Sequence, residues 1–170
     1  IRGAGMQCTM TTGARNLDLA LARAAAEAGL SSASVSIDGG EESHDRLRGA
    51  RGSYRAAMSG LRALREGGVK VTVNTQINRL SMYDLLTMPE LLSHEGVVAW
   101  QIMLTVAMGR AADEPEVLLQ PYDLLELFPM LDGLAQDCAA RDIRLYPCNN
   151  LGSFGPYEHR LRGSLWRGHA

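Results

Sequence analysis

The sequence lacks the cysteine pattern of a disulfide framework or of a metal-binding motif. Its three cysteines, Cys8, Cys138 and Cys148, are odd in number and irregularly spaced, and no two of them form a CxxC pair. A scattered set of this kind indicates a reducing compartment, so we expect a cytoplasmic protein. We assign no metal ligand within the chain.

Long apolar runs are also missing. No segment approaches the roughly 20 consecutive apolar residues that a membrane-spanning helix requires. The first residues, IRGAGMQC, lack the apolar stretch of a secretory signal. The net charge of −2 gives no overall attraction to nucleic acid or to acidic membranes, so we expect neither as a partner. Arginines do cluster in 45–55 and 159–167, where they could bind small anions.

Several common catalytic motifs are absent from the sequence. There is no GxGxxG after a strand, no GxxxxGK[ST] phosphate loop, no HExxH and no GxSxG. Ser36, His44 and either Asp38 or Asp45 could be grouped as a Ser-His-Asp set, but closeness along the chain is not the geometry of a triad. We therefore assign no catalytic residue.

The 170 residues alternate short β-branched runs with longer helical stretches, which predicts a single α/β domain. Asn16 and Ser53 are the expected N-caps of the first two long helices. Strands separated by helices pair in parallel with right-handed crossovers, so a piece of a (β/α) barrel and a doubly wound sheet both fit. The predicted strands cover residues 6–11, 33–37, 69–75, 98–104 and 143–147.

Small polar side chains collect where these predicted strands end. Thr12 follows the first strand, Ser36 and Asp38 lie at the end of the second, and Asn74 lies at the end of the third. Hydroxyl and amide groups both donate and accept hydrogen bonds, which suits a ligand with ribose hydroxyls, an amino acid moiety and a base edge. Each residue also has a simpler interpretation as turn chemistry or as polar filling of a barrel interior.

Four segments in order carry a resemblance to a known family: TTG (11–13), SIDGG with HDRLRG and GSY (36–54), NTQINR (74–79) and MGRA (108–111). This order resembles the central barrel of radical S-adenosylmethionine (SAM) enzymes, and within them the SPASM-type subgroup. It covers residues 6–112. The resemblance implies a partial (β/α) barrel with about five parallel strands and helices on the outside.

The resemblance also implies roles for individual residues. Ser36 corresponds to a serine near the SAM ribose, and Arg48 lies where an arginine approaches the SAM carboxylate. Asp38 and Asn74 occupy pocket-facing strand ends, and Thr12 replaces the usual asparagine of a Thr-Asn-Gly turn. The implied cofactors are SAM and a [4Fe–4S] cluster, and the implied partners are an electron donor and a peptide or protein substrate.

The chain departs from the family pattern at both ends. The CxxxCxxC that holds the cluster and the Gly-Gly-Glu-Pro turn that binds the SAM amino group are absent. His169 stands where the subgroup usually has a cysteine. We therefore expect a fragment that is inactive alone, with residues 1–147 as a partial barrel and residues 148–170 as a connection toward a truncated C-terminal extension.

Two other classes of function remain open from the sequence. The chain could be a noncatalytic SAM-barrel-like module used for binding or as a scaffold. It could also be an unrelated α/β-barrel hydrolase or isomerase with a metal-free pocket. A CxxxCxxC upstream of Ile1 would favour the enzyme, and a start codon near Ile1 would favour the scaffold.

Overall fold

The main element of the protein is a five-stranded parallel sheet, seen in a computed structural model that describes residues 2–166. The strands lie side by side in the order in which they occur along the chain, and every neighbouring pair is parallel. They are β1 (Cys8–Thr12), β2 (Leu30–Ser36), β3 (Lys70–Ile77), β4 (Ala99–Leu104) and β5 (Arg144–Pro147). The predicted α/β class and the predicted strand order are confirmed.

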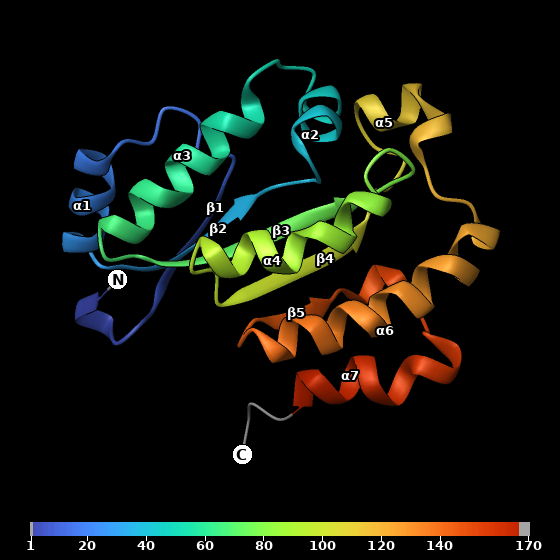
Figure 1. Ribbon diagram of the computed structural model, residues 1–170. Helices are drawn as coiled ribbons and strands as arrows, with labels where there is room; N and C mark the ends of the chain where they lie inside the picture. The colour runs from blue at the N-terminus through green and yellow to red at the C-terminus, as the bar shows by residue number, and fades with distance from the viewer. Residues whose placement is uncertain (1, 167–170) are drawn as a thin grey trace.

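Helices fill the connections between the strands, and most of them lie along one side of the sheet (Figure 1). Short α2 and α5 instead lie at the end of the sheet to which the strand arrows point. The helices are α1 (Leu19–Glu27), α2 (Glu41–Arg48), α3 (Ser53–Glu66), α4 (Met88–His94), α5 (Arg110–Asp113), α6 (Leu124–Ala140) and α7 (Glu158–Trp166). None of the helices within residues 2–166 is long and apolar enough to cross a membrane.

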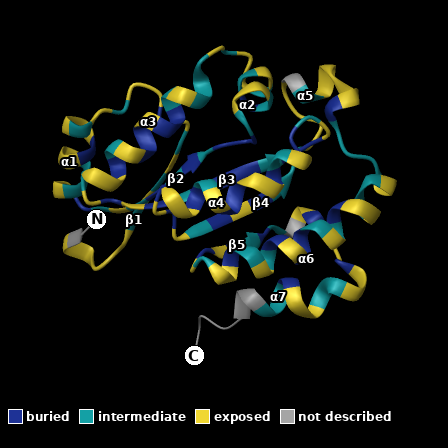
Figure 2. Ribbon diagram, in the orientation of Figure 1, coloured by how far each residue is buried: buried dark blue, intermediate teal, exposed yellow. Residues whose placement is uncertain are grey.

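The two faces of the sheet differ in chemistry because side chains alternate along each strand. The side chains that face the helices form the core, and they include Val35, Val73 and Trp100, each fully buried. This buried layer appears as dark blue along the strands and the inner sides of the helices in Figure 2. Burying a Val, Leu or Ile side chain of this kind stabilises the fold by roughly 1.5–3 kcal/mol.

The opposite face of the sheet carries hydroxyl and amide side chains. Ser36 pairs with Asn74 and Asn74 pairs with Gln101, so these three side chains share that face. Within residues 2–166, β1 and β5 do not pair with each other, and the sheet stays open. The structure is thus consistent with part of a (β/α) barrel whose interior face is polar.

The chain after β5 turns back along the outside of the molecule. Helix α7 packs against β5 and α6, with Leu161 fully buried there. The predicted boundary between residues 147 and 148 stays a prediction, because packing of this kind does not distinguish a connection from a part of the barrel. His169 lies outside the described residues.

Candidate functional site

The segment that follows β2 is bonded to β3 and, through β3, to β4. The carbonyl of Ile37 accepts a hydrogen bond from Thr75 Oγ1 at 2.6 Å, and the same oxygen of Thr75 accepts from Trp100 Nε1 at 2.8 Å. Farther along, the N–H of Gly40 donates to Asp84 Oδ2 at 2.9 Å. The carboxyl end of β2 is therefore placed by β3, β4 and the loop after β3.

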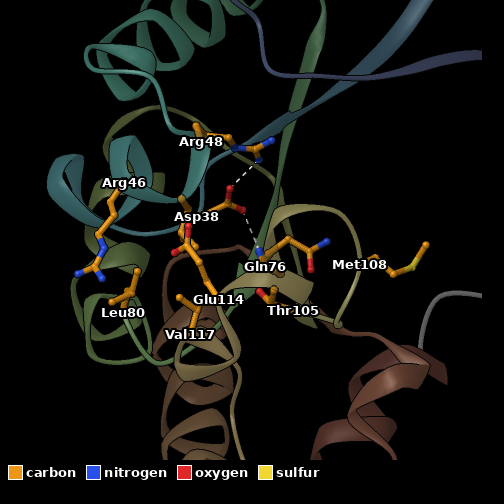
Figure 3. Close-up of a pocket in the computed structure, with 11 residues that line it drawn as sticks. Asp38, Arg46, Arg48, Gln76, Leu80, Thr105, Met108, Glu114 and Val117 are labelled. Atoms are coloured by element: carbon orange, nitrogen blue, oxygen red, sulfur yellow. Dashed lines mark hydrogen bonds and ion pairs between the residues drawn. The ribbon is translucent and has the colours of Figure 1, made fainter.

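Asp38 and Arg48 form an ion pair at this strand end. Arg48 Nη2 lies 2.6 Å from Asp38 Oδ2, and the N–H of Gln76 donates to Asp38 Oδ1 at 2.9 Å (Figure 3). The Asp38 side chain is 3% exposed, whereas the Arg48 side chain is 38% exposed. The buried carboxylate thus has a partner on each oxygen, and the guanidinium remains accessible.

The side chain of His44 binds the backbone of the same aspartate. Its Nδ1 accepts a hydrogen bond from the N–H of Asp38 at 3.0 Å, so Nδ1 carries no proton. The ring is buried and meets Tyr54 edge-on, with 5.9 Å between ring centroids. Burial lowers the pKa of His44, and nearby Arg48 lowers it too, against the opposing charge of Asp38. The lowered pKa favours the neutral ring, which is the form whose Nδ1 can accept this hydrogen bond.

Asp45 joins α2 to α3. Its carboxylate accepts from the N–H of Tyr54 at 2.8 Å, from the N–H of Gly52 at 2.5 Å and from Ser53 Oγ at 2.9 Å. These bonds, that from Tyr54 first, lower the pKa of Asp45 to about 2. The prediction that Ser53 is the N-cap is wrong, since Ser53 is already helical and the capping carboxylate comes from α2. This junction fixes the helix that carries Arg48.

A first cavity of about 240 Å³ opens beside the ion pair. Asp38, Arg48 and Gln76 line one part of it, and Thr105 adds a hydroxyl. Arg46, Glu114 and several apolar side chains form the rest of the wall, which suits a ligand with both an apolar body and a charged group. The apolar side chains include Leu80, Met108, Ala111 and Val117.

A second, larger cavity of about 520 Å³ lies on the polar face of the sheet. Short hydroxyl side chains from the three strands β1, β2 and β3 form much of its lining. Gln101 and Cys148 close its far side, where Gln101 Nε2 donates to Cys148 Sγ at 2.9 Å. The hydroxyl lining comes from Thr9, Thr11, Ser32, Ser34 and Thr72.

Ser36 and Asn74 lie between the two cavities rather than within either lining. Along β2 the order is Ser34, Ser36 and then Asp38, and only the first and last of these line a cavity. The same holds along β3, where Asn74 lies between Thr72 and Gln76. Ser36 and Asn74 share one sheet face, and their roles as ligand-binding residues stay a prediction. A polar track that ends at Arg48 is formed by two parallel rows of side chains: Ser34, Ser36 and Asp38 in one row, and Thr72, Asn74 and Gln76 in the other.

Thr12 is the predicted site residue that the structure places elsewhere. It pairs with Val35, whose side chain is fully buried, so Thr12 lies on the helix-covered side of the sheet. Its Oγ1 accepts from the N–H of Ala14 at 2.9 Å and stabilises the turn. Its neighbour Thr11 pairs with Ser34 and lines the larger cavity. Thr11 and Gln76 are thus two cavity residues that were not predicted from the sequence.

The three cysteines do not share a site. Cys8 begins β1, Cys148 follows β5, and Cys138 is fully buried in α6, where burial raises its pKa to about 12. Within the described part of the chain, no group of three or more Cys, His, Asp and Glu side chains is placed to hold a metal ion together. The described residues therefore do not fit a thiolate-bound iron–sulfur cluster.

Comparison with known proteins supports the resemblance found in the sequence. The family model of the Radical SAM superfamily matches residues 1–78, which contain β1, β2, α2 and most of the polar track. The predicted radical SAM resemblance is thus confirmed for this segment of the chain. The match ends just after β3, so Arg48, Ser36 and Asn74 all fall inside it.

Individual relatives of the chain include synthases and a maturation protein. An AdoMet-dependent heme synthase of Nitratidesulfovibrio vulgaris is 33% identical over 109 residues, which are 64% of this chain and 30% of the relative. An Fe-coproporphyrin III synthase of Methanosarcina barkeri is 34% identical over 96 residues, 56% of this chain and 24% of the relative. The sporulation killing factor maturation protein SkfB of Bacillus subtilis is 29% identical over 82 residues, 48% of this chain and 20% of the relative.

The alignments thus cover less than a third of the length of each of these three relatives. The similarity to the superfamily is thus shown for residues 1–78, whereas the activity, substrate and partners of the whole protein are matters of proposal.

Proposed function

We propose that the polar track at the carboxyl ends of β2 and β3 binds SAM, and that the complete protein is a radical SAM enzyme. The observation that carries this proposal is the arrangement of Ser36, Asn74 and Arg48 along one face and one end of the sheet, within a segment that matches the superfamily. In parallel sheets, ligands bind at the carboxyl ends of the strands.

The track offers a partner for each polar part of SAM. The Ser36 hydroxyl and the Asn74 amide would bond the ribose hydroxyls, because both groups donate and accept. Arg48 would meet the carboxylate, since its remaining N–H donors stay accessible beside the cavity. The apolar wall of the smaller cavity would exclude water from the adenosyl part. Thr12 would contribute only through the turn that its hydroxyl stabilises.

When bound elsewhere in the complete protein, a [4Fe–4S] cluster would supply the electron that cleaves SAM into methionine and a 5′-deoxyadenosyl radical for hydrogen abstraction. The described residues offer no ligand set for that cluster, so the segment alone should be inactive. An external electron donor would then be a partner. The free state of all three cysteines supports a reducing, cytoplasmic setting.

We propose a peptide or protein side chain as the substrate. Hydroxyl and amide groups line the larger cavity, and they match the donors and acceptors of a peptide. The name of SkfB, a maturation protein, also supports this choice. A second candidate is a step of heme formation, which is favoured by the names of the heme synthases at 33% identity.

The proposal is tested by anaerobic reconstitution of the complete gene product with iron and sulfide, followed by assay for 5′-deoxyadenosine with a strong reductant. We expect 5′-deoxyadenosine from the complete product and none from residues 1–170 alone. No 5′-deoxyadenosine from a complete product that holds its cluster would contradict the enzyme assignment. Steady formation by the segment itself would show that its ligands have been misidentified. Adding a candidate peptide or iron coproporphyrin distinguishes the two substrate classes by which one increases turnover.

A further inference from the structure

The Asp38 carboxylate is fully engaged inside the protein. One oxygen accepts the Gln76 N–H and the other pairs with Arg48, while the side chain is 3% exposed. A carboxylate so placed has little surface left for a ligand, and it would repel an anionic one. The sequence resemblance implied that Asp38 contacts SAM directly. Its engaged carboxylate instead favours an indirect role at the site.

We propose that Asp38 is a positioning residue, which aims Arg48 at the carboxylate of the ligand, and that His44 keeps Asp38 in place. This inference rests on the proposed SAM site and assigns two residues that act there through a third. Asp38 is suited to the role because its backbone and its carboxylate are each held by a different element. Its N–H is bonded to His44 of α2, and Oδ1 is bonded to the backbone of β3.

Arg48 needs such support because of where it lies. It is the last residue of α2, directly before Gly49, which ends the helix with φ +61°. Its long side chain has many rotamers, and a part-exposed arginine loses rotamer entropy when one conformation is selected. A fixed partner pre-organises the guanidinium, so less of that entropy is lost when the ligand binds.

Two effects of Asp38 on an anionic ligand oppose each other. Its negative charge offsets part of the attraction between Arg48 and a carboxylate, which would favour removing it. Without Asp38, however, Arg48 would be free to turn toward Glu114, which lines the same cavity. Salt and solvent screen the charge effect at a part-exposed arginine, whereas loss of orientation is not screened. We therefore expect orientation to dominate.

The test compares two adenosyl ligands that differ in the part Arg48 would hold. S-adenosylhomocysteine carries the amino acid moiety, and 5′-methylthioadenosine lacks it. In the complete gene product, Asp38→Asn should weaken S-adenosylhomocysteine binding roughly tenfold or more, the size expected for a hydrogen bond to a charged group. It should leave 5′-methylthioadenosine binding unchanged. Arg48→Ala should give the same selective loss, and Arg55→Ala, which removes an exposed arginine paired with Glu41, should give none.

His44 provides an independent variant for the same test. His44→Ala removes the acceptor for the buried Asp38 N–H and should produce the same selective loss. His44→Asn places an amide oxygen where Nδ1 stands and should restore S-adenosylhomocysteine binding. If Asp38→Asn fails to fold, the two His44 variants decide the matter.

Each outcome separates the positioning role from the proposed site. If Asp38→Asn and His44→Ala lose affinity equally for both ligands, the role of Asp38 and His44 is merely structural and the inference is overturned. Unchanged or tighter S-adenosylhomocysteine binding in Asp38→Asn would show that charge neutralisation dominates, and would overturn it too. Selective loss in Arg48→Ala but not in Asp38→Asn would leave the SAM site standing. If the wild-type protein binds neither ligand, the proposed function and the positioning role both fail.

Discussion

Replacing Gly39 with alanine should loosen the segment that joins β2 to α2. Gly39 has φ +132°, a conformation that residues with a side chain rarely adopt. A Cβ at this position would lie 2.7 Å from Asp84 Oδ2 and 2.8 Å from Ser81 Cβ, well inside normal contact. Asp84 cannot turn away freely, because the same oxygen accepts the Gly40 N–H. Ser81 is fully buried.

The two penalties can be estimated separately. Overpacking typically costs roughly 1–3 kcal/mol, and a strained backbone conformation roughly 1–3 kcal/mol, so the sum is about 2–6 kcal/mol. Hydrogen exchange of peptides covering residues 37–48 measures the local opening free energy. A loss of about 2 kcal/mol corresponds to roughly thirtyfold faster exchange.

Gly68→Ala and Gly13→Ala are the matched controls. Gly68 has φ +85°, and a Cβ added there would have nothing within 4 Å, so alanine should cost only the backbone strain. Gly13 also has open space around it and no such φ, so alanine should change little. Equal losses of local opening free energy in Gly39→Ala and Gly68→Ala would refute the claim that contacts with Ser81 and Asp84 make the loop rigid.

Three further predictions concern residues around the site. Asp45→Asn should lower the denaturant midpoint at neutral pH. Because the pKa of Asp45 in the folded protein lies below the usual 3.8, the wild type should lose this stabilisation as pH falls from about 4 through about 2. The variant should not show this pH-dependent loss. Since burial lowers the pKa of His44, the stability of the wild type should also decline as pH falls below 6.5. His44→Asn should reduce this dependence of stability on pH, as measured by thermal melts at several pH values. Thr75→Val should cost about 2–4 kcal/mol in urea unfolding, because it leaves Trp100 Nε1 and the Ile37 carbonyl without partners; a loss below about 1 kcal/mol would mean that water replaces the hydroxyl.

The strands could be predicted because apolar and polar side chains alternate along them. In residues 69–77 the valines Val71 and Val73 fall on the helix-covered face, and Thr72 and Asn74 fall on the polar face. That alternation is written in the sequence and needs no tertiary information. The order and direction of the strands followed from the same pattern and from the family resemblance.

Helix α2 could not be predicted in the same way, because it has no apolar stripe. His44 is its one buried residue, and the helix lies over a polar strand end rather than over the core. Its placement depends on bonds to distant residues, such as Ser43 Oγ to the Leu80 carbonyl at 3.1 Å. The Asp45 cap on α3 is likewise a contact between elements.

The structure differs from the expected placement at two positions near the N-terminus. The sequence favours Asn16 as the N-cap of α1, but Asn16 has φ +62° and Asp18 accepts the Leu21 N–H at 2.8 Å instead. The sequence also favours Thr12 as a ligand-facing residue, but pairing with β2 turns Thr11 to that face. A shift of one residue reverses every side chain of a strand, and only the register decides it.

The most direct test of the site is a crystal structure of the complete gene product with S-adenosylhomocysteine bound. We expect the ribose hydroxyls within hydrogen-bond distance of Ser36 or Asn74, and the carboxylate on Arg48 while Arg48 still contacts Asp38. A ligand bound away from the carboxyl ends of β2 and β3, or bound there with Arg48 turned into solvent, would contradict the proposed site.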